Sequence, residues 1–390
     1  MSGRVYLDYN ATAPTRPEVR TAMAEAMELH GNPSSVHEEG RGARALIEQA
    51  REKVAALVGA EPRQVIFTSG GTESNVTALS PANVNREDPD GVVCFMPGIE
   101  HPSVLAYGRF APQSVRKIAV TGDGVIDVGA LEDEITEHNA AAGKASFMVS
   151  VMRANNETGA LQPVSEISGI VRQHGGILHC DSVQAAGKIP LDIKALGAHM
   201  MSLSAHKIGG PHGVGALVLG EGFASLPSPL LVGGGQELRA RSGTENVAGI
   251  IGFGAAAECA ARGLDVIAGL APLRDRLEAE IAARAPNAVF FSQNTERLPN
   301  TTNFAVPGMK ADTLVIAFDL AGVAVSAGAS CSSGKVERSH VLEAMNADED
   351  AARGAIRVSL GWNTREEDVD KFIDEWARIY EEFTRQSAAA

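Results

Sequence analysis

Seven short apolar runs between residues 65 and 219, most of them separated by helical patterns, constrain the fold more than any other feature. Short runs of this kind are typical of buried strands. Strands that alternate with helices form a largely parallel sheet with helices on both faces. We therefore predict an α/β fold whose large domain holds a mostly parallel seven-stranded sheet, with strands at residues 65–68, 92–95, 115–120, 147–151, 177–181, 200–203 and 215–219.

The last third of the chain has a different pattern, which predicts a second domain. A chain of 390 residues exceeds what one hydrophobic core usually organises. Beyond about residue 260 a long helix rich in Ala, Arg and Glu is followed by shorter α+β elements and a final amphipathic helix. We predict a large cofactor-binding domain over residues 16–260 and a smaller α+β domain made of residues 1–15 and 261–390.

Composition narrows the class of protein and its partners. The 44% hydrophobic and 21% charged content is that of an ordinary soluble globular protein. A net charge of −14 argues against nucleic acid as the main partner, and we expect no membrane-spanning run and no signal peptide. The four cysteines are far apart, which predicts neither a disulfide framework nor a metal site and favours the reducing cytoplasm.

Two of the predicted strands end in groups that suit pyridoxal 5′-phosphate. The run at 200–203 leads into Ser204-Ala205-His206-Lys207 and a Gly-Gly turn, and the run at 177–181 ends in Asp181. Asp181 lies 26 residues before Lys207, a gap that fits one crossover between neighbouring parallel strands, whose ends meet at one edge of the sheet. A lysine there can bind the cofactor aldehyde, and a carboxylate can keep the pyridine nitrogen protonated. The alternative is a surface lysine in a turn.

Three further stretches follow predicted strands and carry polar groups. The glycines of residues 68–75 stand where a strand leads into a helix, which suits a phosphate, or else form a tight turn. His101 can stack on a flat ring or move a proton, or it is simply a satisfied polar group. The cluster at residues 155–159 either shapes a loop or holds a substrate carboxylate. The donor-rich loops at 233–237 and 241–246 either shape the chain or bind a ligand, and the sequence alone does not decide between the two.

The smaller predicted domain contributes a thiol and a guanidinium. Cys331 stands in a loop of small residues, about 326–338, for which we expect mobility because such side chains cannot anchor it by burial. The other cysteines, Cys94, Cys180 and Cys259, are predicted to be buried apolar residues. Arg357 points away from its apolar neighbours in a predicted strand, where it either clamps a carboxylate or forms a surface ion pair.

Taken together, these motifs resemble the cysteine desulfurases of the nitrogen-fixation and iron–sulfur-cluster type, within fold type I of the pyridoxal phosphate enzymes. The resemblance extends from Tyr6-Leu7-Asp8 to residues 357–361, and its most specific pieces are Ser204-Ala205-His206-Lys207, Asp181 with Gln184, and the loop around Cys331. That loop resembles the first class of these enzymes. The resemblance implies removal of sulfur from L-cysteine, giving L-alanine and a persulfide on Cys331, and transfer of that sulfur to an acceptor or iron–sulfur scaffold protein.

The resemblance also implies a role for each site residue. Lys207 carries the cofactor and moves the α proton, Cys331 takes the sulfur, and His101 stacks on the ring and exchanges protons. Asp181 meets the pyridine nitrogen and Gln184 the phenolic oxygen. The residues implied for the phosphate are Gly71, Thr72, Ser204, His206 and, in a homodimer, Thr244 of the partner subunit. Those implied for the substrate carboxylate are Asn156, Arg357 and Asn32, and Asn156 is implied to bind the cofactor as well.

Alternatives and departures accompany this interpretation. A selenocysteine lyase would use the same cofactor site without an absolute need for Cys331, and an aminotransferase would release a keto acid and leave the cysteine loop without a use. A cofactor-binding scaffold without catalysis is the third alternative. Two residues depart from the family pattern, Arg153 before the asparagine pair and Leu238 where a basic residue is common.

Overall fold

The computed structural model describes residues 3–142, 146–327 and 338–389, and its largest element is a sheet of seven strands. All seven predicted runs are strands, with ends that differ by at most two residues from the prediction. They are β2 (Val65–Thr68), β3 (Val93–Pro97), β4 (Val115–Ile118), β5 (Phe147–Met152), β6 (Ile177–Asp181), β7 (Met200–Ser204) and β8 (Gly215–Leu219).

The strand order explains why the site residues meet. Strands β4, β3, β5, β6 and β7 run parallel in that order, and β8 lies antiparallel between β7 and β2. The reversal has a physical cause, because residues 205–214 between β7 and β8 are too few for a parallel crossover, which takes about a dozen residues or more. The mostly parallel seven-stranded sheet is confirmed. Since Asp181 of β6 pairs with Ser202 of β7, the residues after both strands emerge at one edge.

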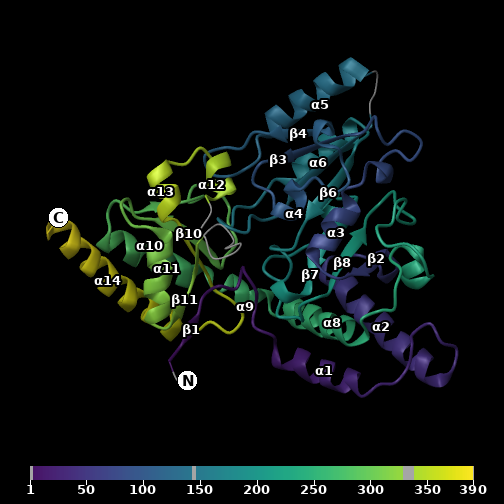
Figure 1. The fold of residues 1–390 in the computed structure, drawn as a ribbon, viewed down its shortest axis with the longest axis horizontal. Coiled ribbons are helices and arrows are strands. Elements are labelled where there is room, and N and C mark those ends of the chain that lie inside the picture. The colour runs from purple at the N-terminus through teal and green to yellow at the C-terminus, as the bar shows by residue number, and fades with distance from the viewer. Residues whose placement is uncertain (1–2, 143–145, 328–337, 390) are drawn as a thin grey trace.

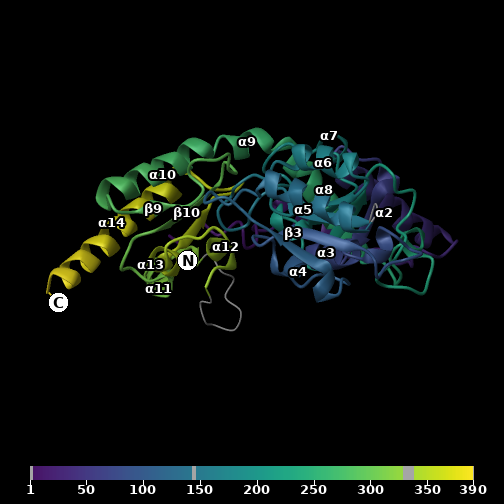
Figure 2. The ribbon, with the colours of Figure 1, turned by 90° about the horizontal axis from the view of Figure 1, so that it is seen from above.

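Helices cover both faces of this sheet, and successive strand residues face opposite sides, as the pleat requires. Phe67 and Val149 pack into the apolar cluster of one face, and their neighbours Ile66 and Met148 into that of the other. Figure 2 shows α6, α7 and α8 on one side of the sheet and α3 and α4 on the other. The helices on the first face are α1 (Pro17–Met27), α2 (Glu38–Leu57), α5 (Val128–Ala142), α6 (Val164–Gln173), α7 (Ile193–Leu196) and α8 (Val247–Arg262), and those on the second are α3 (Gly71–Ala78) and α4 (Pro102–Leu105).

A second part of the molecule, beside the first in Figure 1, has its own small sheet. This sheet is antiparallel and runs β12 (Ser326–Ala327), β13 (Ile356–Ser359), β10 (Thr301–Ala305) and β9 (Val289–Phe290). Its core contains Trp376, which is fully buried with its ring 5.3 Å from that of Phe304. The helices are α9 (Leu264–Ala268), α10 (Ala271–Arg284), α11 (Ala311–Leu320), α12 (His340–Ala344), α13 (Glu349–Gly354) and α14 (Glu366–Ala389).

The N-terminal arm joins this second part. Strand β1 (Val5–Tyr6) pairs in parallel with β11 (Val323–Ala324), and Val5 and Leu7 belong to the same apolar cluster as Trp376. The domain boundaries near residues 15 and 260 stay a prediction. Across the described ranges, no single helix has the length and apolarity to cross a membrane, although 247–262 and 264–284, bent by 61° from each other, reach the required length and composition as a pair.

Candidate active site

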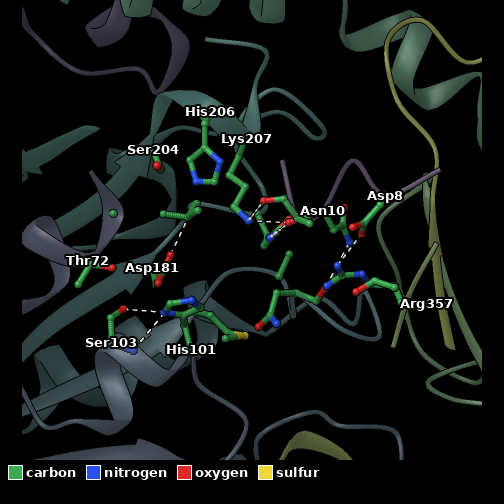
Figure 3. Close-up of a pocket in the computed structure, with 18 of the residues that line it drawn as sticks. Asp8, Asn10, Thr72, His101, Ser103, Asp181, Ser204, His206, Lys207 and Arg357 are labelled. Atoms are coloured by element: carbon green, nitrogen blue, oxygen red, sulfur yellow. Dashed lines mark hydrogen bonds and ion pairs between the residues drawn. The ribbon is translucent and has the colours of Figure 1, made fainter. Parts of the chain in front are cut away.

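A cavity of about 520 Å³ opens where the strand ends of the large sheet face the arm and the small sheet. Its walls come from β6, β7 and the start of α3 on one side, and from the arm, β12 and β13 on the other (Figure 3). Most of the residues predicted for the site line this cavity. They are Gly71, Thr72, His101, Asn156, Asp181, Gln184, Ser204, His206, Lys207 and Arg357.

Lys207 follows β7 in the short 3₁₀ turn η4 (Ala205–Lys207), and its amine reaches across to the arm. Nζ donates to the backbone oxygen of Asn10 at 2.6 Å and to that of Ala11 at 2.8 Å. Burial lowers the pKa of the Lys207 ammonium to about 8, and the nearby Arg357 cation adds to the shift. An appreciable fraction of this amine is therefore neutral near physiological pH, as a nucleophile toward an aldehyde must be.

Asp181 ends β6 and is 5% exposed, with both carboxylate oxygens held by donors. Oδ2 accepts from Asn75 Nδ2 at 2.7 Å, and Oδ1 accepts from the Val183 backbone N–H at 2.9 Å. The same Asn75 amide also donates to Ser103 Oγ at 2.9 Å. These contacts fix the plane of the carboxylate at the cavity wall.

His101 is connected to Asp181 through that amide. Its Nδ1 accepts from the Ser103 backbone N–H at 3.1 Å and lies 2.7 Å from Ser103 Oγ (Figure 3). Burial lowers the pKa of the imidazole, an effect that the Asp181 charge partly opposes. Because Nδ1 accepts a hydrogen bond, the neutral ring carries its proton on Nε2.

One end of the cavity is lined by uncharged donors and by the first turn of α3. Thr72, Ser204 and His206 stand there, and burial together with the neighbouring Lys207 lowers the pKa of His206 to about 4. Gly71 is required by close approach, since a Cβ at this position would lie 2.9 Å from Val183 Cγ2. Hydroxyls, a neutral imidazole and the positive end of a helix form a donor set that suits a phosphate.

The other end of the cavity holds a guanidinium whose Nε donor has no hydrogen-bond partner among the described residues. Arg357 donates to Asp8 Oδ1 and to the Asn156 backbone oxygen, both at 2.8 Å. Its side chain is only 6% exposed, so the ion pair lies in the cavity wall and is not the surface pair that the sequence left open. Arg357 Nε and Asn156 Oδ1 are buried without a hydrogen-bond partner among the described residues. Buried polar atoms in that state are the ones a bound ligand would satisfy.

Two predicted residues within the described chain, Asn32 and Thr244, do not line the cavity. Asn32 is exposed and accepts from the Ser34 backbone N–H at 2.9 Å, and Thr244 is exposed as well. Cys331 lies outside the described residues, and its role stays a prediction. The other three cysteines are free and buried, as predicted.

The two departures from the family pattern differ in how near they lie to the cavity. Arg153 donates through Nη1 to the Gln162 backbone oxygen. Leu238 is 76% exposed. Neither is among the described residues that line the cavity, although Arg153 stands between Met152 and Ala154, which both line it, and its backbone N–H donates to the Asp181 backbone oxygen at 2.8 Å.

Several cavity residues escaped the sequence interpretation. Asp8, Asn10 and Ser103 line the cavity, and Asn75 does so one helical turn after Gly71. The spacing of Asn75 within 68–75 was a usable signal, because residues four apart share a helix face. Asn10 acts partly through its backbone oxygen, a group that every residue carries and that the residue type therefore cannot indicate.

Comparison with known proteins assigns the family. The aminotransferase class-V family model matches residues 5–372, and the chain belongs to this family, whose members are pyridoxal phosphate enzymes with the type I fold. The chain is 40% identical over 386 residues to cysteine desulfurase IscS of Dictyoglomus turgidum, which covers 98% of this chain and 95% of the relative.

Solved structures agree with this assignment. A NifS-like protein from Rickettsia africae superposes with a TM-score of 0.85 at 35% identity, covering 97% of this chain and all of the other. The structure described as SspA in complex with cysteine has a TM-score of 0.75 at 29% identity and covers 91% of this chain and 98% of that one.

Proposed function

We propose that this chain is a cysteine desulfurase that holds pyridoxal 5′-phosphate in the cavity, converts L-cysteine to L-alanine and passes the sulfur to Cys331. The observation that carries the proposal is that Lys207 and Asp181 line one cavity together with Arg357. The relatives named cysteine desulfurases, matched over nearly the whole chain, support the choice of reaction.

The residues of the cavity fit this cofactor. Lys207 would bind its aldehyde, Asp181 its pyridine nitrogen and Gln184 its phenolic oxygen, while His101 would stack on the ring. The donor set at Gly71, Thr72, Ser204 and His206 suits the phosphate, to which Thr244 of the partner subunit would add a hydroxyl. When bound, the cofactor withdraws electrons from the amino acid, which permits loss of the Cα proton and cleavage of the C–S bond.

The protein's own groups orient L-cysteine and move its protons. Arg357 and Asn156, which retain unpartnered polar atoms, would take the substrate carboxylate, and Asn32 is a further candidate from the family pattern. The Lys207 amine would accept the Cα proton. His101 Nε2 is the position for proton exchange with the substrate thiol.

The sulfur step balances without an added oxidant. The Cys331 thiolate attacks the substrate sulfur, an S–S bond forms as the C–S bond breaks, and the bonding electrons remain with the carbon, which takes up a proton. L-cysteine and the thiol thus give L-alanine and a persulfide. An acceptor or iron–sulfur scaffold protein then receives the sulfur, and we propose that the enzyme works as a homodimer in the cytoplasm.

An absorption spectrum combined with product analysis tests this function. Purified protein loaded with pyridoxal phosphate is expected to show a visible band that changes when L-cysteine is added. With a reducing thiol present, alanine and sulfide should form in equal amounts. A keto acid without sulfide would indicate an aminotransferase, and faster turnover of selenocysteine than of cysteine would indicate a selenocysteine lyase. A chain that binds the cofactor but forms no product would be a scaffold.

A further inference from the structure

Lys188 is a buried lysine that none of the roles above uses. It lies in the turn after β6 and is 6% exposed, and Nζ donates to Asn10 Oδ1 and to Gln184 Oε1, each at 2.7 Å. The charged groups that act on it within the described residues are Lys207 and Arg357, which are both cations. Burial and these cations lower the pKa of Lys188 well below its ordinary value. A buried amine without an anion is costly, so its two neutral acceptors are its principal compensation.

The two contacts determine how the Gln184 amide is turned. Because Nζ donates to Oε1, the Nε2 end points the other way and donates to the Asn10 backbone oxygen at 2.9 Å. A flipped amide would place Oε1 against the Asn10 backbone oxygen, two acceptors with no proton between them, and would lose the bond that Oε1 accepts from Lys188. Gln184 lines the cavity, so Lys188 and the Asn10 carbonyl together determine that this residue presents a donor there.

Asn10 is fixed in the same way. Its Oδ1 accepts from Lys188 and its Nδ2 donates to Thr301 Oγ1 at 3.0 Å, while its backbone oxygen accepts from Lys207. The Lys188 amine therefore supports two groups near Lys207, which are the Gln184 amide and the N-terminal arm at Asn10. These hydrogen bonds connect Gln184 and Lys188, in the turn after β6, through Asn10 to Lys207 in the turn after β7. None of them involves a carboxylate.

We propose that Lys188 is a positioning residue for the cofactor site. By donating to both amide oxygens it holds Gln184 Nε2 toward the phenolic oxygen and holds the Asn10 carbonyl against Lys207. This inference rests on the proposed function, since it concerns how the site receives the cofactor.

The expected consequence concerns a proton. A donor at the phenolic oxygen stabilises the negative charge on that oxygen, so the oxygen holds less strongly the proton on the neighbouring nitrogen, which is the Lys207 nitrogen when the cofactor is bound. If the donor is lost, the nitrogen keeps its proton to a higher pH. Other charged or titratable groups near Lys207 are Arg357, Asp8, Asp181, His206 and His101, and the test leaves all of them unchanged.

The test follows the visible band of the loaded enzyme against pH, without turnover. Lys188→Met, which keeps the length of the side chain, is expected to raise the midpoint of the spectral change by on the order of one pH unit. Lys117→Met, a control at an exposed position on β4, should leave it in place. In a Gln184→Leu background, Lys188→Met should add less than half of its own shift. An unmoved midpoint, or an equal shift in both backgrounds, would overturn the proposal, the second because it would reflect charge alone.

A measurement on the unaltered holoenzyme covers the case in which Lys188→Met does not fold. A crystal structure at better than about 1.2 Å resolution distinguishes the amide nitrogen of Gln184 from its oxygen. Nitrogen toward the cofactor supports the proposal, and oxygen toward it overturns it. Failure of the proposed function would look different, since the wild-type protein would then show no visible band with pyridoxal phosphate.

Discussion

At the scale of single residues, the Lys207 amine is placed between charges of both signs. Burial and Arg357 lower its pKa, whereas Asp8 and Asp181 raise it, and the balance leaves the pKa at about 8. Because Arg357 and Asp8 also pair with each other at 2.8 Å, removing one leaves the other unopposed. Replacing Arg357 and replacing Asp8 should therefore shift the pKa of Lys207 in opposite directions.

Replacing Lys207 itself removes the group that binds the aldehyde. Lys207→Ala is expected to lose the visible band of the lysine-bound cofactor and to lower alanine formation by about 10³-fold, within the range for a group that transfers a proton. Absorption spectra and alanine assays measure both effects. Lys117→Ala, which alters an exposed lysine, serves as the control. Turnover by Lys207→Ala within tenfold of wild type would contradict the role.

The protonation of Lys207 predicts a pH dependence for cofactor capture. Only the neutral amine attacks the aldehyde, so the rate at which apoprotein captures pyridoxal phosphate should rise about tenfold per pH unit below pH 8 and level off above it. Arg357→Gln should shift the midpoint upward and Asp8→Asn downward. Stopped-flow absorbance over a pH series measures this, with Arg276→Gln, in a partly buried ion pair that does not line the cavity, as the control. Shifts of the same sign in both variants would refute the charge balance.

At the scale of elements, the strand ends were predictable and the contacts between distant elements were not. Lys207 and Asp181 follow buried apolar runs, and parallel strands bring such ends together, so sequence spacing was sufficient. The antiparallel β8 follows from a connection too short for a crossover. Asn10 and Lys188, in contrast, meet only because the arm crosses from the small sheet to the large one. The sequence around neither residue predicts this contact.

The first turn of α3 offers a test at this scale. Gly71→Ala is expected to weaken cofactor binding and to cost about 1–3 kcal/mol, because its Cβ would lie 2.9 Å from Val183 Cγ2. Gly42→Ala is the matched control, since beyond its chain neighbours and its own helix backbone no atom lies within 4 Å of the added Cβ, and the site is an exposed helix interior. That variant should stabilise by about 0.5–1 kcal/mol. Denaturant unfolding of the apoprotein and cofactor titration give the two readouts. Equal effects at both glycines would contradict the close-approach argument.

At the scale of the whole molecule, the cavity is built by both parts of the chain and the arm connects them. Asn10, in the arm, has contacts on both sides, and it meets Lys188, Gln184 and Lys207 in the large part. In the small part it meets Thr301, Asn300 and Ser359. A ligand in this cavity therefore stabilises an arrangement of two cores and not of one alone, and should raise Tm according to its affinity.

Asn10→Ala tests that connection. The change removes the Oδ1 acceptor of Lys188 and of Asn300 and the Nδ2 donor of Thr301, and it leaves the amine of Lys188 with one partner. A buried group deprived of its partner costs about 1–3 kcal/mol, and each kcal/mol lowers Tm by roughly 2–4 °C in chains of a few hundred residues. Calorimetry of the loaded protein should show this decrease together with a broader or divided transition, because the two cores lose a shared contact. Asn287→Ala, at an exposed position, should leave Tm and the single transition unchanged. If Asn10→Ala lowered Tm while the transition stayed as sharp as in the wild type, Asn10 would contribute stability without coupling the two parts.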